Sequence, residues 1–74
     1  MSDLAKEIMK VMKERQVSSK WELFKEISKN KKVSKKDFEK TLNDLIEKNC
    51  LRSIYGGDTT FALTQKGARE FKLK

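Results

Sequence analysis

The sequence predicts an α+β fold in which three helices precede a two-stranded β-hairpin and a short C-terminal helix. Two observations support this prediction. Apolar residues recur at helical spacing up to Ile46, and after Asn49 the apolar period falls to about two residues, with Gly56-Gly57 between two extended runs. The chain has 74 residues, which is room for one domain over residues 1–74.

The first helix is expected over residues 3–15, with Ser2 or Asp3 as its N-cap. Its core-facing stripe has the spacing of one helical face and consists of Leu4, Ile8, Val11 and Met12. Val17 and Ser18 form an extended link that is too short to classify.

The second helix begins at Ser19, because Ser19 and Glu22 have the spacing of a capping box. Its apolar side is expected to contain Trp21, Leu23, Phe24 and Ile27. Asn30 is a candidate left-handed terminator. Trp21 and Phe24 have two interpretations, as stacking platforms for nucleic-acid bases or as core residues, and their spacing favours burial.

The third helix is expected over residues 34–48, with Ser34 as its cap and Val33 packed on Phe38 as a hydrophobic staple. Its buried side is expected to consist of Phe38, Leu42, Leu45 and Ile46. Asn49 ends the helix. Only about four residues separate the second and third helices, so we expect the two to cross steeply, as in a helix-turn-helix unit.

The segments 50–55 and 59–63 are rich in β-branched and aromatic residues and are expected to pair as a hairpin. Its inward residues are predicted to be Leu51, Phe61 and Leu63, whereas the register leaves open whether Ile54 or Tyr55 faces the core. Thr64 can cap a last helix that runs to about Phe71.

The net charge is +7, and it is concentrated rather than spread along the chain. Residues 29–40 carry a net charge of +4 and residues 64–74 a net charge of +3, whereas residues 41–63 carry −1. An abundance of Lys and Glu is also typical of a solvated surface in a heat-adapted protein. The concentration favours the other interpretation, an electrostatic footprint for a polyanion.

Catalysis, cofactors and metal binding have no support in the sequence. The chain has no histidine and one cysteine, Cys50, and it lacks a glycine-rich nucleotide-binding loop. A lone thiol fits a reducing compartment, and Cys50 itself is expected to be a small buried apolar residue. No apolar run approaches the length of a membrane span. We therefore expect a non-enzymatic cytoplasmic protein that binds no small molecule.

The order of elements, together with the segments Val33–Phe38, Leu45–Asn49 and Leu63-Thr64-Gln65-Lys66-Gly67, resembles a winged helix-turn-helix domain. The last segment is similar to one that follows the wing in MarR-like, PadR-like and archaeal small regulators. The resemblance implies that the third helix enters the major groove of DNA. Two features depart from the family pattern: Asn49 replaces a usual glycine, and the wing tip, Gly56-Gly57-Asp58, has no basic residue.

The predicted DNA-binding residues fall into two groups. On a helical wheel, Lys36, Lys40, Asn43 and Glu47 point away from the buried side of the third helix. Asn43 is the best candidate for base reading, because an Asn side chain can bond adenine bidentately; the alternative is a solvated helix residue. Phosphate contacts are assigned to the helix N-termini, the turn and the first wing strand, namely Ser19, Lys20, Lys29, Lys31, Lys32, Ser34, Lys35 and Arg52. Each Lys can instead be a free surface charge.

The leading hypothesis is therefore a sequence-specific regulator that binds double-stranded DNA. The alternative is a winged helix that binds proteins in a replication or transcription complex. A weak homodimer, or two copies on a palindromic site, stays open, with Met9, Phe71 and Leu73 as the candidate interface.

Overall fold

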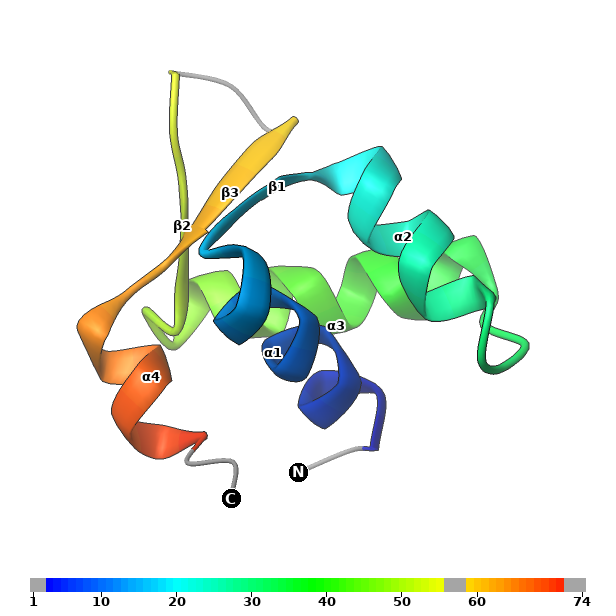
Figure 1. Ribbon diagram of the computed structural model, residues 1–74, viewed down its shortest axis with the longest axis horizontal. Coiled ribbons are helices and arrows are strands. Elements are labelled where there is room, and N and C mark those ends of the chain that lie inside the picture. The colour runs from blue at the N-terminus through cyan, green and yellow to red at the C-terminus, as the bar shows by residue number, and fades with distance from the viewer. Residues whose placement is uncertain (1–2, 56–58, 72–74) are drawn as a thin grey trace.

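The computed structural model describes residues 3–55 and 59–71, and in them the predicted α+β order is confirmed (Figure 1). The helices and strands, in chain order, are α1 (Asp3–Arg15), β1 (Val17–Ser19), α2 (Lys20–Ser28), α3 (Lys35–Glu47), β2 (Leu51–Ser53), β3 (Thr60–Leu63) and α4 (Gln65–Glu70). The bounds of all four helices lie within one or two residues of those predicted, because their caps and apolar stripes are local signals.

The predicted hairpin is present, with β2 and β3 paired antiparallel. A third strand that the sequence did not predict joins it, so the sheet has three antiparallel strands in the order β1-β3-β2. The link at Val17 is the third strand, with Val17 opposite Ala62 and Ser18 opposite Phe61. Gln16 ends α1 with a positive φ of 68°, and its carbonyl accepts a hydrogen bond from the Leu63 amide at 2.9 Å. A three-residue strand has no readable period, so only its pairing partner reveals it.

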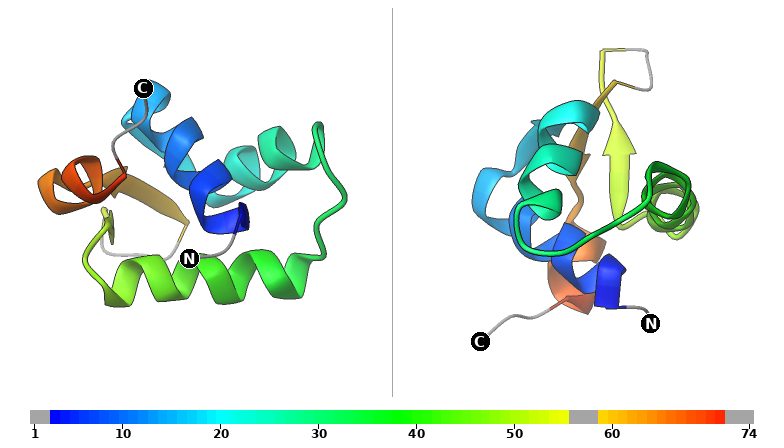
Figure 2. Two further views of the ribbon diagram at one scale, coloured as in Figure 1. Left: turned by 90° about the horizontal axis from the view of Figure 1, so that it is seen from below. Right: turned by 90° about the vertical axis from the view of Figure 1, so that its right-hand side faces the viewer.

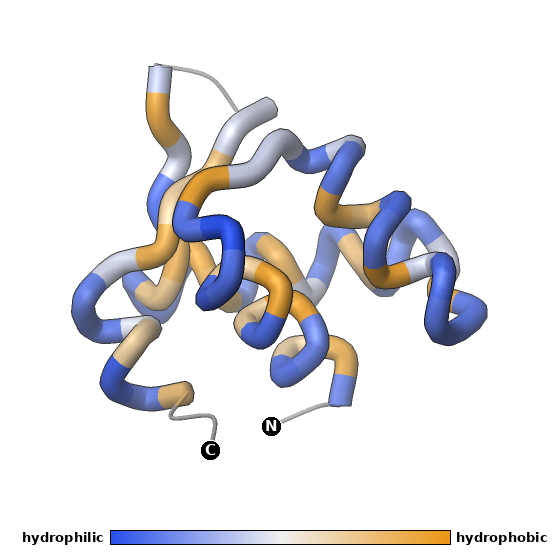
Figure 3. Tube along the Cα trace, in the orientation of Figure 1, coloured by the Kyte–Doolittle hydropathy of each residue, from blue (hydrophilic) through white to orange (hydrophobic). Residues whose placement is uncertain are grey.

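The core lies where α1 and α2 pack on one side of α3 and the sheet closes the remaining edge (Figure 2). Apolar segments run along the inner sides of the helices, and hydrophilic residues cover the outside (Figure 3). The buried residues are Ala5, Ile8, Met9, Met12, Leu23, Ile27, Phe38, Leu42, Leu45, Cys50, Leu51, Phe61 and Phe71. Burial of each large apolar side chain stabilises the fold by about 1.5–3 kcal/mol, so this core is the main source of stability.

Three predicted N-caps are present. The hydroxyls of Ser19, Ser34 and Thr64 accept hydrogen bonds from the amides three residues later, at 3.1, 3.0 and 2.9 Å. Asn49 has the left-handed conformation expected of it, with φ 63°. The same prediction for Asn30 was wrong: α2 ends at Ser28, and the Asn30 amide simply bonds the Ile27 carbonyl at 3.2 Å. The six-residue turn after α2 gives the chain room to reverse without a left-handed residue.

Trp21 is exposed over 67% of its surface, so its predicted burial was also wrong. The core side of α2 is set by Leu23 and Ile27, which are fully or almost fully buried. At about 100° per residue, Trp21 lies roughly 200° around the helix from Leu23, on the opposite side. Phe24 lies between these two directions and is half-buried, packed edge-on against Phe38 with ring centroids 5.1 Å apart.

Two of the three residues of the candidate dimer interface, Met9 and Phe71, belong to the buried core. Met9 is 1% exposed and Phe71 is 8% exposed, so neither side chain is available to a second copy. Leu73, the third residue of that candidate interface, lies outside the described residues, as does the acidic wing tip. Buried Met9 and Phe71 instead help to attach α4 to α1.

The first turn of α4 is seated on the start of β2. The Thr64 hydroxyl donates to the Cys50 carbonyl at 3.0 Å, and the Thr64 amide donates to the same oxygen at 3.2 Å. Cys50 is fully buried, as expected, and its thiol donates to a Glu70 carboxylate oxygen at 3.2 Å. Burial raises the pKa of the Cys50 thiol, and the neighbouring Glu70 charge adds to the rise. Cys50 is therefore a protonated thiol at neutral pH.

Gly67 marks the closest approach in this attachment. A β-carbon at Gly67 would meet the Cys50 carbonyl oxygen at 2.2 Å, a separation that only backbone movement relieves. We expect Gly67→Ala to lower the free energy of unfolding by about 1–3 kcal/mol, despite the better helix propensity of Ala. Urea unfolding followed by circular dichroism measures the change. Gln65→Ala, at an exposed site of the same helix, is the matched control and should stay within about 0.5 kcal/mol; equal stability of the two variants would contradict the close approach.

Candidate nucleic-acid interface

The outward side of α3 carries the polar residues that the sequence placed there. Lys36, Lys40, Asn43 and Glu47 are all exposed. They lie outward because Phe38, Leu42 and Leu45 occupy the buried side of the same helix. No other described element covers this side of α3 in either view of Figure 2. Lys36, Lys40 and Asn43 therefore form an open row along the first two-thirds of the helix, which we call the α3 row.

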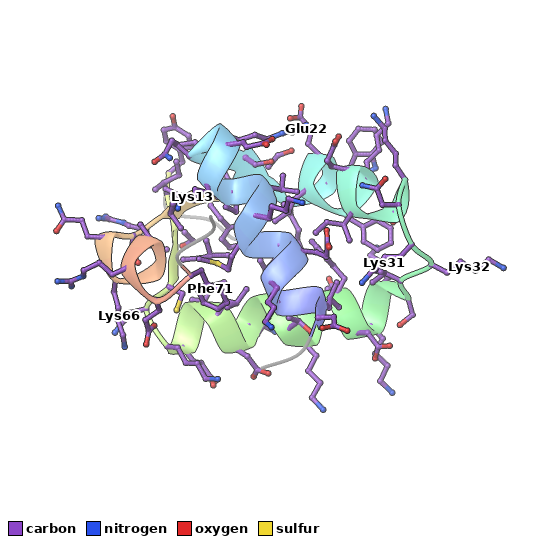
Figure 4. All side chains as sticks on the ribbon, turned by 60° about the horizontal axis from the view of Figure 1, so that its bottom comes forward. Lys13, Glu22, Lys31, Lys32, Lys66 and Phe71 are labelled. Carbon is purple, nitrogen blue, oxygen red and sulfur yellow. The ribbon has the colours of Figure 1, made fainter. Side chains whose placement is uncertain are left out.

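The turn between α2 and α3 adds charge next to the α3 row. Lys31 and Lys32 are exposed, and among the described residues neither makes an ion pair. They lie at the end of the molecule opposite Lys66, and Lys32 extends away from the protein (Figure 4). Lys29 differs from them, because its ammonium lies 3.5 Å from a Glu26 carboxylate oxygen that also contacts Arg15. Lys31 and Lys32 are thus the free cations of the turn.

The N-termini of α2 and α3 are both closed by their own side chains. Ser19 is half-buried and Ser34 is exposed, and each hydroxyl oxygen accepts from its own helix. These two hydroxyls therefore act as helix N-caps. Lys35 follows Ser34 at the first position of the helix and is exposed.

Lys20 was expected to contact phosphate, but the structure pairs it with an acid that the sequence did not single out. Its ammonium lies 2.7 Å from Oε1 of Glu39 on α3. The hydrogen bond and the charge of Lys20 hold the pKa of Glu39 below its ordinary value, and Lys35 contributes less. Lys20 and Glu39 are separated by the rest of α2, the turn after it and the first four residues of α3, so no local spacing in the sequence pairs them. The Lys20–Glu39 pair links the start of α2 to the middle of α3.

A crevice beside the Lys20–Glu39 pair separates α3 from the sheet. It has a volume of about 380 Å³, and Asn43 and Ser53 contribute to its lining, with Ile46 and Phe61 behind them. Ser53 was not among the predicted site residues, and only the hairpin register brings it opposite Asn43's side of α3. Asn43 therefore stands at the edge of a hollow rather than on a flat helix surface.

Arg52 is not brought together with the other predicted residues. It is exposed on β2, and its neighbours across the sheet are Ala62 on β3 and then Val17 on β1. Successive side chains of a strand point to opposite faces, so Arg52 and Ser53 lie on opposite faces of the sheet. Since Ser53 lines the crevice against α3, Arg52 lies on the far face.

Two other kinds of feature are absent from the described part of the chain. None of its helices is both long and apolar enough to cross a membrane. Residues 3–55 and 59–71 contain no group of three or more His, Cys, Asp and Glu side chains that could hold a metal ion.

Comparison with known proteins identifies the family. The model of the linker histone H1 and H5 family matches residues 1–68, which is nearly the whole chain. The chain belongs to this family. Linker histone domains are winged helices that bind double-stranded DNA in chromatin and are not enzymes. No curated protein and no solved structure matches the chain.

The family assignment confirms the winged-helix interpretation, and the family binds double-stranded DNA, the partner that the sequence predicts. It does not support the narrower resemblance to MarR-like and PadR-like regulators. That resemblance depended on short, degenerate segments around Leu63–Gly67, which cap and attach α4 in this fold. Such segments serve packing in any winged helix and therefore discriminate poorly between families of the same fold.

The Lys20–Glu39 pair has a measurable effect on the pKa of Glu39. The Glu39 carboxyl of the intact chain should titrate below its ordinary pKa, and Lys20→Gln should raise that pKa towards the ordinary value. Carbon-detected NMR of the Glu side chains measures both. Lys29→Gln is the control, because Lys29 pairs with Glu26 and should leave Glu39 unchanged. An unshifted Glu39 in the unsubstituted protein would mean that the pair does not form in solution.

Proposed function

We propose that this chain binds duplex DNA with α3 in the major groove and with the turn between α2 and α3 on the flanking phosphates. The observation that carries the proposal is the α3 row, Lys36, Lys40 and Asn43, exposed beside the unpaired Lys31 and Lys32. An α-helix fits the width of the major groove, and its N-terminal part makes the base contacts in this type of docking. In this arrangement Lys31 and Lys32 lie beside the DNA backbone that borders the major groove.

Phosphate contacts supply most of the affinity in this proposal. A Lys ammonium is a compact point charge on a flexible stem, so it suits phosphate contacts and carries little directional information. Four such cations, Lys31, Lys32, Lys36 and Lys40, flank the one outward amide, Asn43. Lys20 contributes less, because Glu39 already neutralises it.

Sequence preference is the second part of the proposal, and it depends on Asn43. Its Nδ2 can donate to N7 of adenine while its Oδ1 accepts from the N6 amino group, a pairing that no other base offers in the major groove. With one reading residue, the preference is modest. Occupation of a preferred site near a promoter is how such a protein would regulate transcription.

Binding to duplex DNA should depend strongly on salt. If about four to six phosphates are contacted, log K should fall against log salt with a slope of roughly −4 to −5. Fluorescence anisotropy with a labelled random duplex at several salt concentrations measures it. Lys32→Ala should weaken binding to all duplexes and reduce the slope by about one unit, whereas Lys66→Ala, at the other end of the molecule, should change neither. A slope near zero would favour the protein-binding alternative.

The Asn43→Ala substitution distinguishes sequence-specific base contacts from sequence-independent phosphate contacts. On the preferred duplex, found by selection from a random pool, the substitution should cost about 1–3 kcal/mol of binding free energy. Binding to random DNA should change little, because phosphate contacts dominate there. Asn43 is exposed, so the variant should keep the melting temperature of the unsubstituted chain. Equal loss on all duplexes, or no selected preference at all, would remove the sequence-specific part of the proposal and leave the phosphate-based part intact.

A further inference from the structure

Trp21 is the largest apolar side chain that the described fold leaves in solvent. It is 67% exposed at the start of α2, and the ammonium of Lys25, one turn later, lies 4.9 Å from its ring centroid. A single exposed apolar residue requires no explanation by itself. Trp21 differs because it borders a groove.

The groove lies between the first turns of α2 and α3 and has a volume of about 300 Å³. Its apolar lining comes from Trp21, Phe24 and Phe38, with the last two rings in edge-on contact. Its polar lining includes Lys35 and the Lys20–Glu39 pair. This volume is at the lower limit of ligand sites and is enough for one or two bulky side chains, rather than a folded domain.

The charges around the groove select the kind of occupant. Within residues 3–55 and 59–71, Lys25 and Lys35 have no ion-pair partner. Lys35 lines the groove, and Lys25 lies over the Trp21 ring in the adjoining hollow, which shares Trp21 and Phe24 with the groove. Glu39 is the acid in the lining, and Lys20 neutralises it. The complement of this arrangement is an apolar side chain with carboxylates next to it. A second copy of this chain is a poor complement, because each copy carries a net charge of +7.

A nucleic-acid base fits the groove less well. A base can stack on Trp21, but the Phe24 and Phe38 rings, which form the rest of the apolar lining, offer its polar edge no hydrogen bonds. Leaving such groups buried without partners costs about 1–3 kcal/mol each. A Leu or Phe side chain carries no such groups.

We infer that the groove lined by Trp21, Phe24 and Phe38 docks an acidic segment of a partner protein that inserts a bulky apolar side chain. The inserted side chain covers one face of Trp21, and its flanking carboxylates meet Lys25 and Lys35. Trp and other aromatic residues at the centre of small interfaces commonly dominate binding, and charges at the rim add specificity. This inference does not depend on DNA binding by the α3 row.

The only tryptophan of the chain stands in this groove, so its fluorescence reports on this site alone. The experiment titrates the full chain with a short synthetic peptide in which a central Leu-Phe pair is flanked on both sides by Glu residues. We expect a saturable blue shift of the Trp21 emission as the ring loses water. Two matched peptides, one with Ser in place of Leu-Phe and one with Gln in place of Glu, should each bind at least about tenfold more weakly.

Variants of the chain complete the test by calorimetry with the first peptide. Trp21→Ala should weaken binding by about tenfold or more, and Lys25→Ala by about threefold, with the latter loss disappearing at high salt. Lys66→Ala, a matched loss of charge at the opposite end of the molecule, should bind like the unsubstituted chain. Trp21 and Lys25 are both exposed, so thermal melting should show all three variants folded.

Four results would overturn the inference. They are equal binding of the Ser-substituted peptide, unchanged affinity of folded Trp21→Ala, a blue shift of the chain alone that grows with its concentration, and saturation of the Trp21 signal by an oligothymidine strand but not by the acidic peptide. The third result would assign the groove to self-association and the fourth to single-stranded nucleic acid.

Discussion

The burial of one stripe of α3 against α1 and α2 is the constraint on which the rest of the structure depends. Phe38, Leu42 and Leu45 occupy the inner side of α3, at most 2% exposed. A helix of 13 residues is marginal by itself, so α3 is stable only while this stripe is packed. The same packing turns the opposite side outward. The exposure of the α3 row is therefore a consequence of the core, and no residue in the row needs to be held by a contact of its own.

The Lys20–Glu39 pair sets the electrostatic pattern on this side of the molecule. It stands between two hollows, since both residues line the groove beside Trp21 and the crevice beside Asn43. Because Lys20 on α2 pairs with Glu39 on α3, neither side chain is left as a free charge, so the surface proposed to bind DNA has one free cation fewer and the groove one free anion fewer. An exposed ion pair contributes little to stability, so its effect is mainly on where free charge remains. That charge remains on the turn, on the α3 row and beside Trp21.

A linker histone family domain with a charge distribution of this kind is suited to holding DNA rather than to reading it. The cations of the turn and of the α3 row are lysines, and a single amide among them, Asn43, can discriminate bases. On the far side of the ion pair, an aromatic groove offers a different chemistry, suited to apolar side chains with acidic neighbours. One small core thus supports two surfaces, because α2 and α3 each present an outward side where they meet.

The sequence by itself determined the four helices, the N-caps of the last three and the outward face of α3. Each of these depends on residues within one or two turns, such as Ser34 with Asp37, or Phe38 with Leu42 and Leu45. Tertiary structure alone decided the third strand, the exposure of Trp21 and the Lys20–Glu39 pair. The strand at Val17 exists only because β3 pairs with it. Trp21 is exposed to solvent because Leu23 and Ile27 occupy the buried side of the short helix α2. Lys20 meets Glu39 across two elements whose approach is set by core packing, and sequence periodicity carries no information about contacts between distant elements.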